Sequence, residues 1–324
     1  MAEIPFVEPL DDVRYGAVEQ VSPLIRRIIA NNPSKYSYRG TGTYIVGHGD
    51  VAVIDPGPAL DEHRDALAAA LDGQRVRAIL ITHCHSDHSP LAAWLRESTG
   101  APTIAFGPHG VVAIDNDDDD DDTESETESE TEHESDIKMK ESIDVAFVPD
   151  VYAVDGSIVA SARDWTMRAV FTPGHTSNHM CFALHEERAL FTGDHVMGWS
   201  TTVVSPPDGD MRAYINSLSK VIERNDRILW PTHGNPVTDP QLFLTAYLAH
   251  RLEREAQVLA QVRNDVRTID AIVKVLYSNV HKELHKPAGR SVLSHLVKLV
   301  ADESVAVDGG GAPSLKSTFV MPRA

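Results

Sequence analysis

Three histidines and an aspartate lie within six residues of one another, at His83, His85, Asp87 and His88. They come directly after the apolar run 78–81, so they fall in the loop that ends a buried strand. Neutral imidazole and carboxylate groups suit Zn²⁺, which takes about four ligands at roughly 2.0 to 2.2 Å. Two histidines separated by one residue can share one ion, whereas Asp87 and His88 can face a second ion. The loop therefore predicts the beginning of two metal sites, and both sites need further ligands.

Three more groups of these types stand where predicted strands end. His175 follows a strand that ends at 171, Asp194 follows the strand 188–192, and His233 follows the strand 227–230. Open α/β sheets usually place their sites at the carboxyl ends of strands. We therefore expect His175, Asp194 and His233 to complete the two sites.

The elements that position these groups alternate between strand and helix along the first 238 residues. A hairpin over 44–54, a helix over 61–71 and a strand over 76–82 form a βαβ-like unit, and Ser89 is the expected N-cap of the next helix. Further strands are expected over 102–106, 145–148, 151–158, 165–171 and 180–184, with a helix over 208–224.

The C-terminal part is predicted to be helical. Apolar spacing indicates a long helix over 240–262, then helices over 269–279 and 291–303 with a turn at 287–290 between them. This order, followed by a β-like end near 309–311, resembles a winged-helix module.

Composition and charge narrow the class of protein. Of the 324 residues, 42% are hydrophobic, which is enough for a sizeable core. No apolar segment approaches the roughly 20 residues of a membrane span, and the first residues do not resemble a secretion signal. The two cysteines, Cys84 and Cys181, are too few for a disulfide framework. We expect a cytoplasmic globular protein with no membrane partner and the possibility of a homodimer.

The formal charge of −19 is concentrated in one tract. Residues 115–136 contain 14 Asp and Glu and no Lys or Arg, and removing those 14 charges from −19 leaves only −5 for the rest of the chain. A tract without apolar residues cannot form a core, so we expect a disordered acidic insert that serves as a solvated spacer. A cation sink or a docking site for a basic partner is the alternative.

The seven groups and the glycines beside them resemble the metallo-β-lactamase superfamily. The matching positions are His83, His85, Asp87, His88, Gly174-His175, Gly193-Asp194 and His233-Gly234. The resemblance implies an α/β fold, a four-layer αββα sandwich with two mixed sheets, and a small C-terminal winged-helix-like domain. The implied domains are a hydrolase domain over 1–238, a connecting helix over 239–265, and a winged-helix-like domain and tail over 266–324.

Within that superfamily the chain is similar to the β-lactamase-like protein 2 group, which has the winged-helix-like tail and includes a zinc endoribonuclease. Residues 39–44, 172–176 and 201–203 carry this similarity, which covers nearly the whole chain apart from the acidic insert and the last residues. Two departures lie near the expected mouth: Ser89-Pro90-Leu91 stands where Gly-Gly is usual, and Thr41-Gly42-Thr43 replaces Thr-Asn-Thr.

The resemblance also assigns roles to the seven groups. His83, His85 and His175 would hold the first zinc, Asp87, His88 and His233 the second, and Asp194 would bridge the two. Zinc ions roughly 3.5 to 4 Å apart lower the pKa of a shared water towards about 7, which supplies hydroxide to attack a carbonyl or phosphoryl centre. Asp87 would orient that water, so Asp87 is both a ligand and a catalytic residue. Iron or manganese could occupy the same ligands.

These assignments predict a metal-dependent hydrolase of an ester, thioester, lactone or β-lactam. A single-strand-specific endoribonuclease is the alternative within the same chemistry, so the expected substrate is a small molecule or RNA. A nucleic-acid-binding module with a structural metal core is the alternative from another class. DNA binding by the tail is not expected, because Lys282, Lys286, Arg290 and Lys298 form only a modest basic set.

Other residues near the site have weaker assignments. His179 is a candidate catalytic residue, either as a partner of a ligand or as an ordinary strand residue. His195 favours packing, and Cys84 favours burial in the core rather than metal binding. Tyr36 and Tyr38 either line the mouth or pack against the surface.

Overall fold

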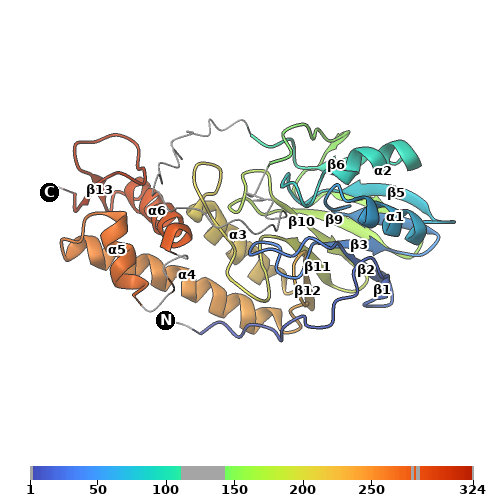
Figure 1. The fold of residues 1–324 in the computed structure, drawn as a ribbon, viewed down its shortest axis with the longest axis horizontal. Coiled ribbons are helices and arrows are strands. Elements are labelled where there is room, and N and C mark those ends of the chain that lie inside the picture. Colours follow the sequence, from blue (N-terminus) through green and yellow to red (C-terminus); the bar gives the residue numbers. More distant parts are fainter. Residues whose placement is uncertain (1–2, 111–142, 279–280, 282–284, 323–324) are drawn as a thin grey trace, which may run out of the picture.

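The computed structural model describes residues 3–110, 143–278, 281 and 285–322, and the predicted acidic insert over 115–136 lies outside the described residues. Two β-sheets pack face to face, and helices cover both outer faces (Figure 1). This arrangement is the αββα sandwich that the sequence predicted, so the predicted fold class is confirmed.

The first sheet has seven strands that lie side by side in sequence order. Its strands are β1 (Glu19–Gln20), β2 (Ile25–Ile29), β3 (Gly42–Val46), β4 (Asp50–Ile54), β5 (Arg75–Leu80), β6 (Thr103–Ala105) and β7 (Val151–Tyr152). Strands β1 to β4 pair antiparallel and β4 to β7 pair parallel. The parallel half therefore presents several carboxyl ends at one edge.

The second sheet has five strands in the order β12-β11-β10-β9-β8. Its strands are β8 (Ile158–Ser161), β9 (Thr166–Phe171), β10 (Met180–Leu184), β11 (Ala189–Gly193) and β12 (Ile228–Pro231). Only β11 and β12 pair parallel. Since β9 and β11 both run antiparallel to β10, the carboxyl ends of β9, β11 and β12 share one edge.

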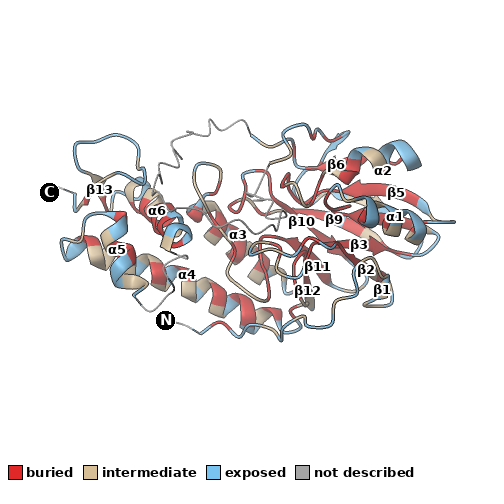
Figure 2. Ribbon diagram, viewed as in Figure 1, coloured by how far each residue is buried: buried red, intermediate tan, exposed pale blue. Residues whose placement is uncertain are grey.

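Three apolar cores hold the layers together. The central core lies between the sheets and contains large side chains such as Tyr44, Phe182 and Trp230. Helices α1 (Asp61–Ala70) and α2 (Leu91–Thr99) pack on the outer face of the first sheet, and α3 (Met211–Arg224) and α4 (Pro240–Arg263) cover the second. Figure 2 shows the strands buried, with the helices buried on one side only.

The C-terminal elements form a fourth core at one end of the sandwich (Figure 1). Helices α5 (Ile269–Leu276) and α6 (His285–Ala301) pack with the hairpin of β13 (Ala306–Val307) and β14 (Phe319–Val320). Helix α4 belongs to two cores, because Phe243 and Tyr247 pack against the second sheet whereas Val258 and Val262 pack against α5 and α6. The predicted division at 239 and 266 stays a prediction.

Helix α4 is 24 residues long, long enough in principle to cross a bilayer. Its sequence includes Arg251, Arg254 and several other charged residues. No helix in the described part of the chain combines the length and apolar character of a membrane span.

The predicted turn at 287–290 is wrong, because these residues lie inside α6. Pro287 is the third residue of the helix, where its missing N–H removes no intrahelical bond. Gly289 is buried, and a Cβ at this position would meet Ile269 Cγ2 at 3.5 Å. The absence of a side chain there lets α5 and α6 approach closely.

Two predictions near the insert are also wrong. Residues 145–148 form no strand: Phe147 packs on the outer face of the first sheet, while Val145 and Val148 are exposed. Ser89 does not cap α2, whose N-cap is Pro90 without a side-chain bond. The Ser89 hydroxyl instead donates to Asp144 Oδ2 at 2.7 Å, which ties the metal-binding loop to the chain that follows the insert.

We expect the substitution Tyr44→Phe to lower the free energy of unfolding by about 1 kcal/mol, the usual loss for one buried hydrogen bond. The Tyr44 hydroxyl is buried and donates to the Pro231 carbonyl at 2.6 Å, which joins the two sheets beside β12. Urea unfolding measures the change, and Tyr36→Phe is the matched control because Tyr36 is only partly buried. Equal stability of the two variants would contradict the role assigned to this bond.

Candidate metal centre

The seven predicted ligand groups all meet where the two sheets present carboxyl ends at the same edge. They form two groups whose ligand atoms lie within 4.8 Å of one another: His83, His85, His175 and Asp194, and beside them Asp87, His88 and His233. Asp87, with 23% of its side chain exposed, is the most open of them, and the others are largely buried. The structure therefore brings together side chains from separate segments of both sheets.

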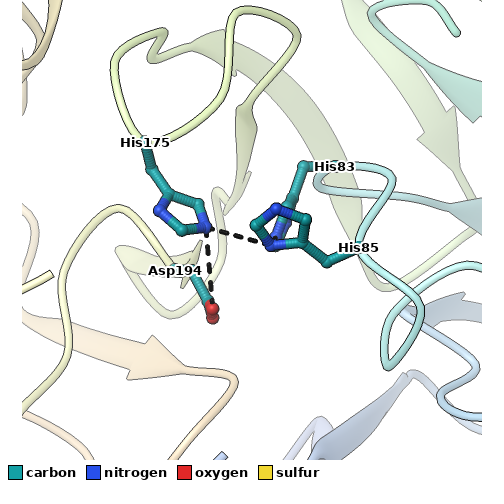
Figure 3. A group of neighbouring side chains, drawn as sticks. All are labelled: His83, His85, His175 and Asp194. Atoms are coloured by element: carbon teal, nitrogen blue, oxygen red, sulfur yellow. Dashed lines mark hydrogen bonds and ion pairs between the residues drawn. The ribbon is translucent and has the colours of Figure 1, made fainter. Parts of the chain in front are cut away.

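In the first group, three imidazole nitrogens point at one another (Figure 3). His85 Nδ1 lies 2.9 Å from His83 Nε2 and 3.2 Å from His175 Nε2, and His175 Nε2 lies 3.9 Å from Asp194 Oδ2. Nitrogens at 2.0 to 2.1 Å from a tetrahedral ion are separated by roughly 3.3 Å. The observed spacings are close to that value.

In the second group, two imidazoles face two carboxylates. His88 Nε2 lies 3.5 Å from Asp87 Oδ1 and 3.7 Å from Asp194 Oδ1. His233 Nε2 lies 3.4 Å from both Asp87 Oδ2 and Asp194 Oδ1. Since Asp194 turns Oδ2 to the first group and Oδ1 to the second, it stands between them.

Partners on the outer side of four imidazoles fix which nitrogen faces inward. The outer contacts are His83 Nδ1 to Thr82 Oγ1 at 3.0 Å, His88 Nδ1 to Asp55 Oδ2 at 2.9 Å, His175 Nδ1 to the Val203 carbonyl at 2.7 Å and His233 Nδ1 to the Gly40 carbonyl at 3.2 Å. Carbonyl and carboxylate oxygens only accept, so the Nδ1 atoms that face them carry the protons. The Nε2 atoms of these histidines therefore point into the centre.

The electrostatics of the first group fit a cation. Burial and the neighbouring imidazoles hold the pKa of His83 well below its usual range and lower the pKa of His85 to about 3. These rings are therefore neutral, and their lone pairs converge without a proton to share. A divalent cation is the species that such a set of neutral nitrogens and one carboxylate accommodates.

The second group shows the same need for positive charge. Burial alone would raise the pKa of Asp194, but His233 and His88 hold it well below its usual value. Burial would likewise lower the pKa of His88, yet the carboxylates of Asp87, Asp194 and Asp55 raise it well above the usual value. The inward atoms His88 Nε2 and Asp194 Oδ1 are buried without a hydrogen-bond partner. Protons on the imidazoles here occupy the place that a metal ion would take.

Asp55 is a functional residue that the sequence analysis missed. Its carboxylate is buried and accepts from the Thr82 amide at 2.8 Å, the Thr82 hydroxyl at 2.7 Å, His88 Nδ1 and the Thr232 hydroxyl at 3.4 Å. It was interpreted as part of the turn that ends a hairpin. The available signal was its position, because Asp55 follows strand β4 just as the seven groups follow their strands.

A second chain of hydrogen bonds holds Asp87. The Thr41 hydroxyl donates to Asp87 Oδ2 at 2.8 Å, and Asn32 Nδ2 donates to Thr41 Oγ1 at 2.9 Å. The Thr41 amide donates back to Asn32 Oδ1 at 2.9 Å. The segment that carries the sequence similarity near residues 32–43 therefore positions the most exposed member of the centre.

His179 lies behind the centre. It is buried, its Nδ1 faces Thr172 Oγ1 at 2.9 Å, and its Nε2 accepts from the Asp194 amide at 3.2 Å. Gly193 has a φ of +52°, and a Cβ there would lie 2.7 Å from His179 Nε2. His179 thus contacts the backbone of Asp194. His195 is buried against Tyr214, with ring centroids 5.0 Å apart.

The cysteine and tyrosine side chains near the centre have structural contacts. Cys84 is buried in the outer core of the first sheet, and its sulfur accepts from Asn178 Nδ2 at 3.1 Å. Burial raises the pKa of the Cys84 thiol to about 11. Tyr38 stacks on Trp199 with ring centroids 4.6 Å apart, and Tyr36 is half-buried.

Two protein families match the chain. Residues 39–233 match the metallo-beta-lactamase superfamily, and residues 268–312 match the beta-lactamase associated winged helix domain. The first match spans the two sheets from β3 to β12 with all seven groups, and the second spans α5, α6 and β13.

Relatives and solved structures agree with these matches. An atrochrysone carboxyl ACP thioesterase of Aspergillus chevalieri is 31% identical over 97% of this chain and 90% of its own length. The lactamase-like protein adaB of Aspergillus niger is 28% identical over 95% and 89%. A beta-lactamase domain protein from Burkholderia ambifaria has a TM-score of 0.72 at 20% identity, covering 97% of this chain and 96% of that one. A metallo-beta-lactamase family protein from Thermus thermophilus has a TM-score of 0.67 at 21% identity, covering 94% and 100%.

We expect Asp55→Ala to weaken metal binding by roughly 10- to 100-fold, the usual effect of removing a group that orients a histidine ligand. His88 and Thr82 would lose their common acceptor. The metal content after dialysis against a weak chelator measures the effect. Asp50→Ala is the matched control, because Asp50 begins the same strand at the opposite edge. Equal metal retention by the two folded variants would refute the assignment.

Proposed function

The chain belongs to the metallo-β-lactamase superfamily of hydrolases, and on this premise we propose that it is a dinuclear zinc hydrolase that acts on thioesters. The observation that carries the proposal is the pair of adjoining ligand groups with Asp194 between them. Each group alone offers three or four ligand atoms, which is the number that one zinc ion takes from a protein.

In this proposal His83, His85 and His175 hold one zinc ion, Asp87, His88 and His233 hold the other, and Asp194 contacts both. A ligand set of imidazoles and carboxylates suits zinc and is also open to iron or manganese. When bound, such ions polarise a carbonyl oxygen and lower the pKa of water towards neutrality.

The side chains of the protein contribute position and proton transfer. Asp87 is the group that reaches towards solvent, so its carboxylate is placed to orient the attacking water and to accept its proton. Thr41 holds one oxygen of Asp87 in place. His179 acts on the reaction only through the backbone of Asp194, so we assign it a positioning role.

Two considerations favour a thioester as the substrate. The relative from Aspergillus chevalieri, similar over nearly the whole chain, is named as a thioesterase that acts on an acyl carrier protein. A thiol with a pKa near 8.5 also leaves far more readily than an alcohol or an amine. No feature of the described residues favours RNA over a thioester: Lys298, one of the predicted basic set, pairs with Glu255 at 2.7 Å and Asp302 at 2.8 Å.

We expect the zinc-loaded protein to hydrolyse benzoyl-N-acetylcysteamine, with release of thiol measured by a thiol-reactive dye. A chelator should abolish the activity and zinc should restore it. The substitution Asp87→Asn should lower kcat by at least about 100-fold, the lower range for the loss of a general base. Asp164→Asn is the control, since Asp164 is exposed in the turn before β9.

Nitrocefin and a fluorescent single-stranded RNA complete the substrate panel. Cleavage of RNA without hydrolysis of the thioester would replace the proposal with the endoribonuclease alternative. Unchanged turnover in both Asp87→Asn and His88→Ala would remove the proposed role of the centre altogether.

A further inference from the structure

A second hollow lies next to the metal centre, between the N-terminal segment, the loop after β11 and helix α4. Its volume is about 630 Å³, and its walls include Ile4, Phe6, Trp199, Ser200, Thr201 and His250. This volume lies within the range of pockets that bind drug-sized molecules. None of the seven metal-centre groups lines it, so it is a separate site.

The hollow adjoins the metal centre through Trp199. The Trp199 ring lies over Gly234, the residue after His233, and a Cβ at Gly234 would meet Trp199 Cδ1 at 3.0 Å. Gly234 has a φ of +93°, so a glycine is needed there for both reasons. Tyr38 stacks on Trp199 and lies beside the same glycine. One wall of the hollow is therefore built directly on the loop of a metal-centre histidine.

The loop that carries Trp199 reaches the centre a second time. Four residues later, the Val203 carbonyl accepts from His175 Nδ1 at 2.7 Å. The segment 199–203 thus runs from the hollow to the first ligand group. A molecule with one end at the metal centre can place its other end in the hollow by passing this segment.

The walls have the chemistry of a site for a flat aromatic group. Trp199 Nε1 is enclosed, so the ring offers its carbon face, and Phe6, with 45% of its surface exposed, offers a second aromatic wall. The hydroxyls of Ser200 and Thr201 and the ring of His250 add polar groups at the other side. Burial, Arg251 and Arg254 lower the pKa of His250 to about 4, so that ring is neutral at pH 7.

We propose that this hollow binds the acyl portion of the thioester substrate, and that the acyl group is a flat aromatic bearing hydroxyl or carbonyl oxygens. The proposal rests on the proposed function. The thiol arm of a carrier is a narrow, flexible chain, whereas the hollow is wide and has two aromatic walls. Trp199 is accordingly the residue that determines acyl specificity, by stacking on the ring system.

Two thioesters of the same thiol test the proposal: 2-naphthoyl-N-acetylcysteamine and acetyl-N-acetylcysteamine. The substitutions Trp199→Ala and Phe6→Ala should each lower kcat/KM for the naphthoyl substrate by roughly tenfold, the loss expected for one aromatic contact, and leave the acetyl substrate unchanged. Trp199→Phe should retain most of the naphthoyl activity. Trp94→Phe is the control, because Trp94 packs on the outer face of the other sheet.

Equilibrium dialysis of anthraquinone-2-carboxylate against the metal-free protein gives a readout that does not depend on hydrolysis. Binding by the wild type and its loss in Trp199→Ala and Phe6→Ala are the expected results. Equal losses for both thioesters, or dialysis binding that is the same in all variants, would overturn the assignment of the hollow. If no thioester is hydrolysed, the proposed function fails, and the dialysis result still decides whether the hollow binds an aromatic group.

Discussion

The buried carboxylate of Asp55 holds the metal centre together. It accepts hydrogen bonds from the Thr82 amide and hydroxyl, from His88 and from Thr232, which belong to loops on both sheets. Burying a carboxylate costs several kcal/mol unless donors surround it, and here four donors do so. Its φ of +46° is a left-handed conformation that aspartate tolerates better than most residues. This conformation lets the chain leave β4 while the side chain turns back towards the loop after β5.

The distance between the two ligand groups depends on how the sheets meet at this edge. The Met180 amide donates to the Thr82 carbonyl at 2.8 Å, and the Gly42 amide donates to the Thr232 carbonyl at 2.8 Å. Each bond joins a strand end of one sheet to the loop of a ligand in the other. Because the central core is close-packed, the sheets cannot slide without breaking these bonds. The centre is thus rigid before any ion binds, and rigidity is what a site with short ligand distances requires.

The sequence predicted the seven groups because each is a metal-binding type of residue directly after an apolar strand. It did not predict the role of Asp55, because a Pro-Gly-Pro run follows it and suggested only a turn. The wrong turn at 287–290 has a similar cause: proline and glycine usually mark breaks, but Pro287 lies in a first helical turn and Gly289 allows contact with Ile269. The hollow beside Trp199 could not be predicted, since its walls come from segments near residues 4, 199 and 250, and no local pattern joins them.

The C-terminal helices influence the centre through α4, although they supply none of its ligands. The Tyr247 hydroxyl accepts from the Thr202 amide, and the Arg251 guanidinium donates to the Thr202 carbonyl. The next residue, Val203, fixes the orientation of His175. Two turns further along α4, Val258 packs into the core formed with α5 and α6. A shift of those helices would therefore move the loop that carries both the Trp199 wall and the acceptor for His175. The winged-helix region thus acts as a support that keeps the substrate wall and the first ligand group in register.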